Sequence, residues 1–193
     1  MPRNKEYKRE NVLDAATKVF WKKGFTGTSV NNLIEATGLG KRSLYQEFGN
    51  KEALFKECLE NYILNVNKEA NSILPRKPLG LQNIIDFFQN RINYASTCDC
   101  DGCMVVKAAL EKELIDVQIF SIVQDALTGH EEAFLNCLVA AQENGEISAD
   151  KDCKALAGYL MTFAVGMMVK GKTDVSRESL EAGVKVLLSV LTN

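Results

Sequence analysis

The chain has 193 residues, of which 46% are hydrophobic, and its net charge is -2. This is enough to bury a core, either as one domain or as two small ones. Three prolines, thirteen glycines and few β-branched runs favour helices over strands. The charged N-terminus predicts no secretory signal peptide, and the most apolar stretch, residues 158–169, is too short for a membrane span of roughly 20 residues.

Charge is distributed unevenly along the chain. Residues 1–51 hold ten basic and five acidic residues, whereas the remainder holds 13 basic and 20 acidic residues. A basic first quarter on an acidic body indicates a head that binds nucleic acid and a body with another role.

The first 50 residues predict three helices. Apolar side chains recur at helical spacing over residues 8–23, and Gly24 is placed to end that helix. A second helix starts at a Thr or Ser cap and ends near Gly38, a typical left-handed stop position. After a short turn, a third helix covers residues 40–48.

The third helix directs its polar residues outward if Leu44 and Phe48 face the core. In a helix-turn-helix, the N-terminal residues of the second helix of the motif reach base edges in the major groove. Lys or Arg can pair with guanine, and Ser or Gln can add hydrogen bonds. The outward residues are Lys41, Arg42, Ser43, Tyr45 and Gln46.

The run from Gly38 to Leu54 resembles the signature of TetR/AcrR-type transcriptional regulators. Such regulators end a short recognition helix in Tyr-x-x-Phe and open the long fourth helix with Lys-Glu-x-Leu. The residues that match these two motifs are Tyr45, Phe48, Lys51, Glu52 and Leu54. An upstream set resembles the rest of the family's head: Ala15, Ala16, Phe20, Gly24, Phe25, Thr28, Ser29 and Val30. The resemblance covers about the first 55 residues.

The resemblance implies a role for each matched position. Thr28, Tyr45 and Lys51 would hold phosphates, while Lys41, Arg42 and Ser43 would face bases or nearby phosphates. Phosphate contacts set the register of a protein on DNA, and base contacts specify the sequence. Double-stranded operator DNA is thus the expected partner.

Glu47 departs from the family pattern, in which this position is often aromatic or histidine. A carboxylate cannot donate a hydrogen bond to phosphate and would repel it. We therefore leave Glu47 out of the expected DNA contacts.

The remaining sequence predicts an all-α protein of about nine helices. A helix-turn-helix domain at residues 1–50 would be joined by a long helix to a helical effector-binding and dimerisation domain at residues 51–193. The expected helices of the body cover residues 51–74, 79–96, 103–114, 116–144, 150–170 and 176–191.

Three cysteines, Cys98, Cys100 and Cys103, lie within six residues of one another. Thiolates select soft metals, but three sulfurs without a nearby histidine do not complete a site. Alternatively, Cys103 could sense oxidants or electrophiles at a helix N-terminus, with Cys98 or Cys100 resolving it. A third interpretation is that the cluster only packs. We expect neither a metal nor a cofactor.

Two further sets of residues are expected from helical face and residue type. In the family, the last two helices form a four-helix dimer interface. An effector pocket would be lined by Phe55, Tyr62, Phe88, Ile92, Val106, Phe134 and Phe163. A homodimer interface would be formed by Leu156, Tyr159, Phe163, Gly166, Leu180, Val184, Leu187 and Leu191.

These features predict a cytoplasmic, homodimeric repressor that binds a near-palindromic operator and is released by a small, mostly apolar effector. The alternative is a thiol-based sensor acting through the cysteine cluster. A helical enzyme is the remote alternative, because one histidine and no glycine-rich phosphate loop leave little to build a catalytic site. A protein that coats DNA without specificity is disfavoured by the acidic body.

Overall fold

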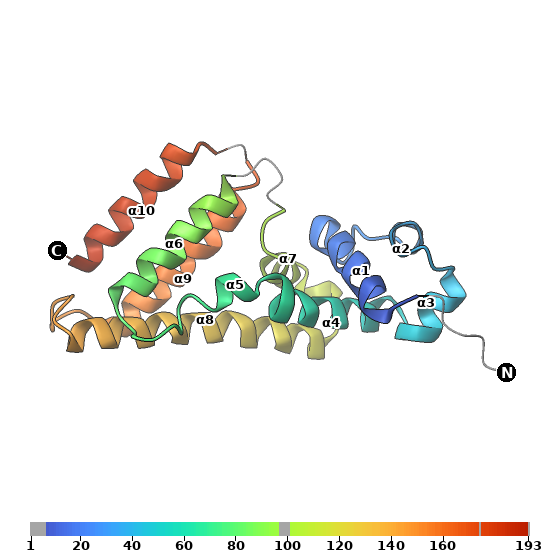
Figure 1. Ribbon diagram of the computed structural model, residues 1–193, viewed down its shortest axis with the longest axis horizontal. Helices are drawn as coiled ribbons and strands as arrows, with labels where there is room; N and C mark the ends of the chain where they lie inside the picture. The colour runs from blue at the N-terminus through green and yellow to red at the C-terminus, as the bar shows by residue number, and fades with distance from the viewer. Residues whose placement is uncertain (1–6, 97–100, 174, 193) are drawn as a thin grey trace. The chain divides into compact units, whose positions relative to one another are not determined.

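The computed structural model describes residues 7–96, 101–173 and 175–192. These residues form ten α-helices and no strand, which confirms the expected all-α class (Figure 1). By its internal contacts the chain divides into two compact units. The first holds residues up to Val66 together with Cys103–Gln124, and the second holds Asn67–Gly102 together with the residues from Asp125 onward.

Three helices begin the first unit: α1 (Arg9–Lys23), α2 (Val30–Thr37) and α3 (Lys41–Phe48). α1 ends at Gly24, whose φ of 74° is left-handed and whose N–H donates to the carbonyl of Phe20. The three helices share a small apolar core, as the sequence predicted. Its buried side chains are Val12, Ala16, Phe20, Leu33, Leu44 and Phe48.

The long helix expected over residues 51–74 is interrupted. α4 (Lys51–Asn61) begins at Asn50, whose side chain accepts the N–H of Ala53 at 2.8 Å. A π-helical segment follows at Tyr62–Val66, and then the short α5 (Lys68–Asn71). The sequence places Asn at 61, 65, 67 and 71, and Asn has low helix propensity because its side chain competes for hydrogen bonds. This break accounts for ten α-helices where about nine were expected.

The first unit also includes a segment from the middle of the chain. It comprises α7 (Met104–Leu110), a 3-10 turn (Lys112–Leu114) and the first residues of α8 (Val117–Glu143). α7 packs on α1 and buries four apolar side chains, Met104, Val105, Val106 and Ala108.

The second unit is a helical bundle. α6 (Leu81–Ala95), α9 (Cys153–Lys170) and α10 (Arg177–Thr192) pack side by side, and the remainder of α8 belongs to the same unit (Figure 1). Aromatic rings fill part of its core: the ring centre of Phe88 lies 5.8 Å from those of both Phe134 and Phe163.

α9 is apolar around its circumference. It begins at Cys153, so it is longer than the apolar stretch noted in the sequence. By length and composition it is the one helix among the described residues that could cross a membrane, with a mean hydropathy of 1.2 over 18 residues. Only 28% of that stretch is buried within the chain, so much apolar surface on α9 is uncovered.

Candidate nucleic-acid interface

The turn between α2 and α3 is defined by its caps. Ser29 accepts the N–H of Asn32 and Asn32 accepts the N–H of Ser29, each at 3.1 Å, which forms a capping box at the start of α2. Gly38 ends α2 in the left-handed conformation, with φ 69°. Gly40 precedes α3 and offers no side-chain cap, so the first N–H groups of α3 have no partner from the N-cap side chain.

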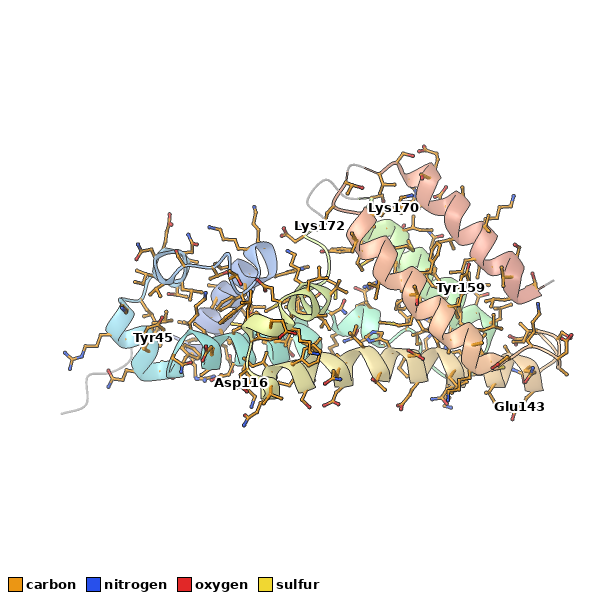
Figure 2. All side chains as sticks on the ribbon, turned by 180° about the vertical axis from the view of Figure 1, so that it is seen from behind. Tyr45, Asp116, Glu143, Tyr159, Lys170 and Lys172 are labelled. Carbon is orange, nitrogen blue, oxygen red and sulfur yellow. The ribbon has the colours of Figure 1, made fainter. Side chains whose placement is uncertain are left out.

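α3 has one buried and one exposed face. Leu44 and Phe48 are buried, whereas Lys41, Arg42 and Ser43 are exposed at the first turn of the helix. A shallow, open depression follows this surface, lined by Lys41, Arg42, Tyr45 and Gln46. Figure 2 marks Tyr45 on α3. The structure thus brings together the residues that the sequence placed on the DNA-facing side of α3.

Thr28 lies elsewhere. Its side chain is 1% exposed, and its hydroxyl donates to the carbonyl of Gly24 at 2.6 Å. The hydroxyl therefore faces the interior of the head. A hydroxyl in this position is not available to a phosphate at the surface of the head.

Lys51 starts α4 and is half-buried. Its ammonium lies 4.4 Å from the centre of the Phe25 ring, a cation–π distance. Burial lowers the pKa of Lys51, and the carboxylates of Glu111 and Glu52 oppose this by raising it. The aromatic contact holds the ammonium in place at the start of α4.

Glu47 has a structural role that the sequence did not reveal. Its carboxylate accepts a hydrogen bond from the Tyr7 hydroxyl at 3.0 Å and pairs with Arg9 at 3.2 Å. The Arg9 guanidinium also lies 4.5 Å from the centre of the Phe48 ring. Glu47 thus joins the start of α1 to α3 inside the head, which fits its omission from the expected DNA contacts.

The expected effector residues fall into both units. Phe55 packs in the core of the head, with its ring 5.0 Å from Phe20 and 5.1 Å from Phe25, and Tyr62 packs on Trp21 at 5.1 Å. Val106 is also in the first unit and is buried. The second unit buries three of the expected residues, Phe88, Ile92 and Phe134. A fourth, Phe163, is half-buried, with its ring centre 5.8 Å from that of Phe88.

The expected dimer residues behave differently on the two helices. On α9, Tyr159 is 39% exposed and Gly166 is exposed, while Leu156 and Phe163 are half-buried. On α10 the expected residues are all buried within the protomer: Leu180, Val184, Leu187 and Leu191. They form one apolar stripe along α10, which packs against α6 and α9. The exposed apolar residues of α10 are instead Val186 and Val190.

The cysteine cluster is only partly described. Cys98 and Cys100 lie outside the described residues, and Cys103 is a half-buried free thiol before α7. Within the described residues, no group of three His, Cys, Asp or Glu side chains could hold a metal ion.

A helix-turn-helix whose second helix begins with an exposed basic turn is typical of DNA-binding proteins. Residues 12–58 match the family model "Bacterial regulatory proteins, tetR family", and residues 80–187 match "Tetracyclin repressor-like, C-terminal domain". The second match alone spans more than half of the chain. The chain belongs to the TetR family of transcriptional regulators, and it is a DNA-binding regulator and not an enzyme.

Individual relatives agree with this assignment. The uncharacterized HTH-type transcriptional regulator YezE of Bacillus subtilis is 30% identical over 193 residues, covering 99% of this chain and all of the relative. The HTH-type transcriptional repressor ComR of Escherichia coli is 30% identical, covering 92% of this chain and 86% of ComR. A cysteine mutant of the TetR-family regulator CifR, solved with 26-base-pair operator DNA, superposes with a TM-score of 0.86 at 27% identity, covering 98% and 99% of the two chains.

Proposed function

We propose that this protein is a homodimeric repressor that binds a near-palindromic operator through α3 and leaves it when a small, mostly apolar effector binds the helical body. The observation that carries the proposal is the exposed first turn of α3, where two cations and a hydroxyl project beside helix N–H groups that receive no hydrogen bond from an N-cap side chain. Such a terminus attracts phosphate and reaches base edges.

Each residue of this surface has a separate role. Arg42 and Lys41 pair with guanine edges or adjacent phosphates, and Ser43 adds a hydrogen bond. Tyr45 and Lys51 hold phosphates on either side, because a phenol hydroxyl and an ammonium both donate to phosphate oxygens. The contact of Lys51 with Phe25 positions the ammonium before DNA arrives.

Dimerisation is supported by the uncovered apolar surface of α9 and α10. A helix that is apolar on all sides is normally buried, yet most of α9 is not buried within the protomer. Tyr159 and Val169 on α9 and Val186 and Val190 on α10 are exposed apolar side chains. A second copy that covers this surface would place two heads on successive major grooves, about 34 Å apart.

The effector site is proposed in the second unit, at the cluster of Phe88, Phe134 and Phe163. The ring centre of Phe88 lies 5.8 Å from that of Phe134 and 5.8 Å from that of Phe163. An apolar molecule that separates them would favour the dimer geometry that misfits the operator. The protein would act in the cytoplasm, and the relatives named above do not favour the thiol-sensor alternative.

Selection of bound genomic fragments tests the proposal. Purified protein is incubated with sheared genomic DNA, and enriched fragments are sequenced and footprinted. We expect a two-fold symmetric footprint with half-sites about 10 base pairs apart, centre to centre, or a multiple of this spacing. A screen of apolar small molecules should then find one that releases the fragment. Enrichment of no common sequence would contradict operator binding, and a one-sided footprint would contradict the dimer.

A further inference from the structure

The junction between α1 and α2 is held by a carboxylate from a distant part of the sequence. Glu111 follows α7 in the same compact unit. Its Oε2 accepts the N–H of Phe25 at 2.8 Å, and its Oε1 accepts the N–H of Thr26 at 2.9 Å. A single side chain thus satisfies two consecutive main-chain donors of the turn that leads into α2.

Lys107 holds the other side of the same junction, one helical turn before Glu111. Its ammonium donates to the carbonyls of Trp21 and Lys22, the latter at 3.0 Å. These carbonyls belong to the last turn of α1, where main-chain acceptors lack partners within the helix. A cation there also opposes the negative end of the helix dipole. Lys107 therefore fixes the end of α1, and Glu111, four residues later, fixes the turn that follows α1.

Gly24, between these two contacts, allows the approach of Glu111. A Cβ atom at this position would lie 3.1 Å from the Glu111 Oε2, and the φ of +74° already disfavours other residues. The local sequence of the head is thus adapted to a carboxylate that comes from about 86 residues further along the chain.

The junction is connected to the groups proposed to bind DNA. The Lys51 ammonium lies over the ring of Phe25 at a cation–π distance. Burial lowers the pKa of Lys51, and the negative charge of Glu111 raises it. The turn also leads directly into α2, which packs against α3. A change at the junction would therefore move both Lys51 and the recognition helix.

We propose that Glu111 and Lys107 are positioning residues for operator binding. They hold the α1–α2 junction in the geometry that presents α3 and Lys51 to DNA, and they act through main-chain groups of the head. Both side chains come from the α7 segment, which belongs to the same compact unit as the junction. This inference rests on the proposed function.

Binding to operators of altered spacing tests the inference. The full-length protein is compared with Glu111→Ala, Glu111→Gln, Lys107→Met and the matched control Glu113→Ala, which removes an exposed carboxylate from the adjacent turn. Affinity is measured for the selected operator and for versions with one base pair inserted or deleted between half-sites. Hydrogen exchange of the Phe25 and Thr26 amides and the melting temperature are followed in each variant.

We expect Glu111→Ala to bind the native operator about tenfold more weakly than the parent protein. We also expect a smaller difference in its affinity between the native operator and the operators with altered half-site spacing. The amides of Phe25 and Thr26 should exchange faster. Glu111→Gln keeps one acceptor oxygen and should be intermediate, and Lys107→Met should also lose spacing discrimination. These two variants decide the matter if Glu111→Ala does not fold.

Two outcomes would overturn the inference while the proposed function stands. One is that Glu111→Ala matches Glu113→Ala in affinity and spacing preference. The other is a uniform loss of affinity at every spacing, which would indicate a general destabilisation of the head. If the unmodified protein itself selects no sequence, the proposed function and this inference are both wrong.

Discussion

The Arg9 guanidinium lies 3.2 Å from the carboxylate of Glu47, whose side chain is only 9% exposed. On its other side the same guanidinium donates to Glu57 at 2.8 Å, and the hydrogen bond with Glu57 is the main reason that the pKa of Arg9 is raised. One arginine at the start of α1 therefore links α3 to α4. Glu47 is the residue of α3 that contacts this arginine.

Replacing Glu47 with Ala should lower the free energy of unfolding by about 1 kcal/mol. The Tyr7 hydroxyl and Arg9 would each lose an acceptor, but Arg9 keeps Glu57 and is partly solvent-exposed, which limits the cost. Urea denaturation measures the change. Glu35→Ala, at an exposed position of α2, is the control, and equal stability of the two variants would show that the Arg9–Glu47 contact contributes nothing.

Replacing Arg42 with Ala should weaken operator binding by about tenfold or more, because a bidentate pair with a base contributes about 1–3 kcal/mol. If Arg42 pairs with a phosphate instead, the slope of affinity against salt should fall by about 1. The side chain is exposed, so the melting temperature should not change. The control is Lys185→Ala, which removes an exposed cation from α10 and so makes the same change in net charge. If both variants bind the operator as tightly as the parent protein, α3 does not present Arg42 to DNA.

Replacing Val186 with Lys should weaken dimerisation by at least about tenfold, since a charge would be buried in the proposed interface. Val186 is 64% exposed in the protomer, so folding of the single chain should be unaffected. Sedimentation velocity over a range of concentrations measures the shift. Val117→Lys is the matched control, because Val117 is 77% exposed at the start of α8; an unchanged dimer in Val186→Lys would place the interface elsewhere.

Cys58 and Cys137 should resist alkylation in the folded protein at neutral pH. Burial raises the pKa of Cys58 to about 12 and that of Cys137 to about 11, so neither forms the reactive thiolate. Cys103 is less buried and should react sooner. Peptide mapping after timed iodoacetamide labelling, with and without urea, compares the sites. Rapid labelling of Cys58 or Cys137 in the native protein would contradict the packing described.

The head was predicted well because its signals are local. The cap at Asn50, the left-handed Gly38 and the outward face of α3 each depend on residues within one or two turns of one another. Thr28 was harder to place, because a helix-start threonine can point outward or back to the preceding turn. Its hydrogen bond with Gly24 shows the second arrangement.

The body was predicted less well because regular apolar spacing does not say what covers a helix face. The stripe of α10 that contains Leu187 recurs at helical spacing, and it is buried within the protomer. The hydrogen bonds of Glu111 could not be predicted either. Its partners lie about 85 residues away in the chain, and the only sequence signal is an i, i+4 pair of opposite charge with Lys107.

Competition between a selected operator and a scrambled duplex of equal length tests operator recognition by α3 most directly. Fluorescence anisotropy at one fixed salt concentration gives both dissociation constants. We predict that the operator is bound at least about a thousandfold more tightly than the scrambled duplex, and that Arg42→Ala reduces this ratio. Equal affinity for the two duplexes would contradict the account.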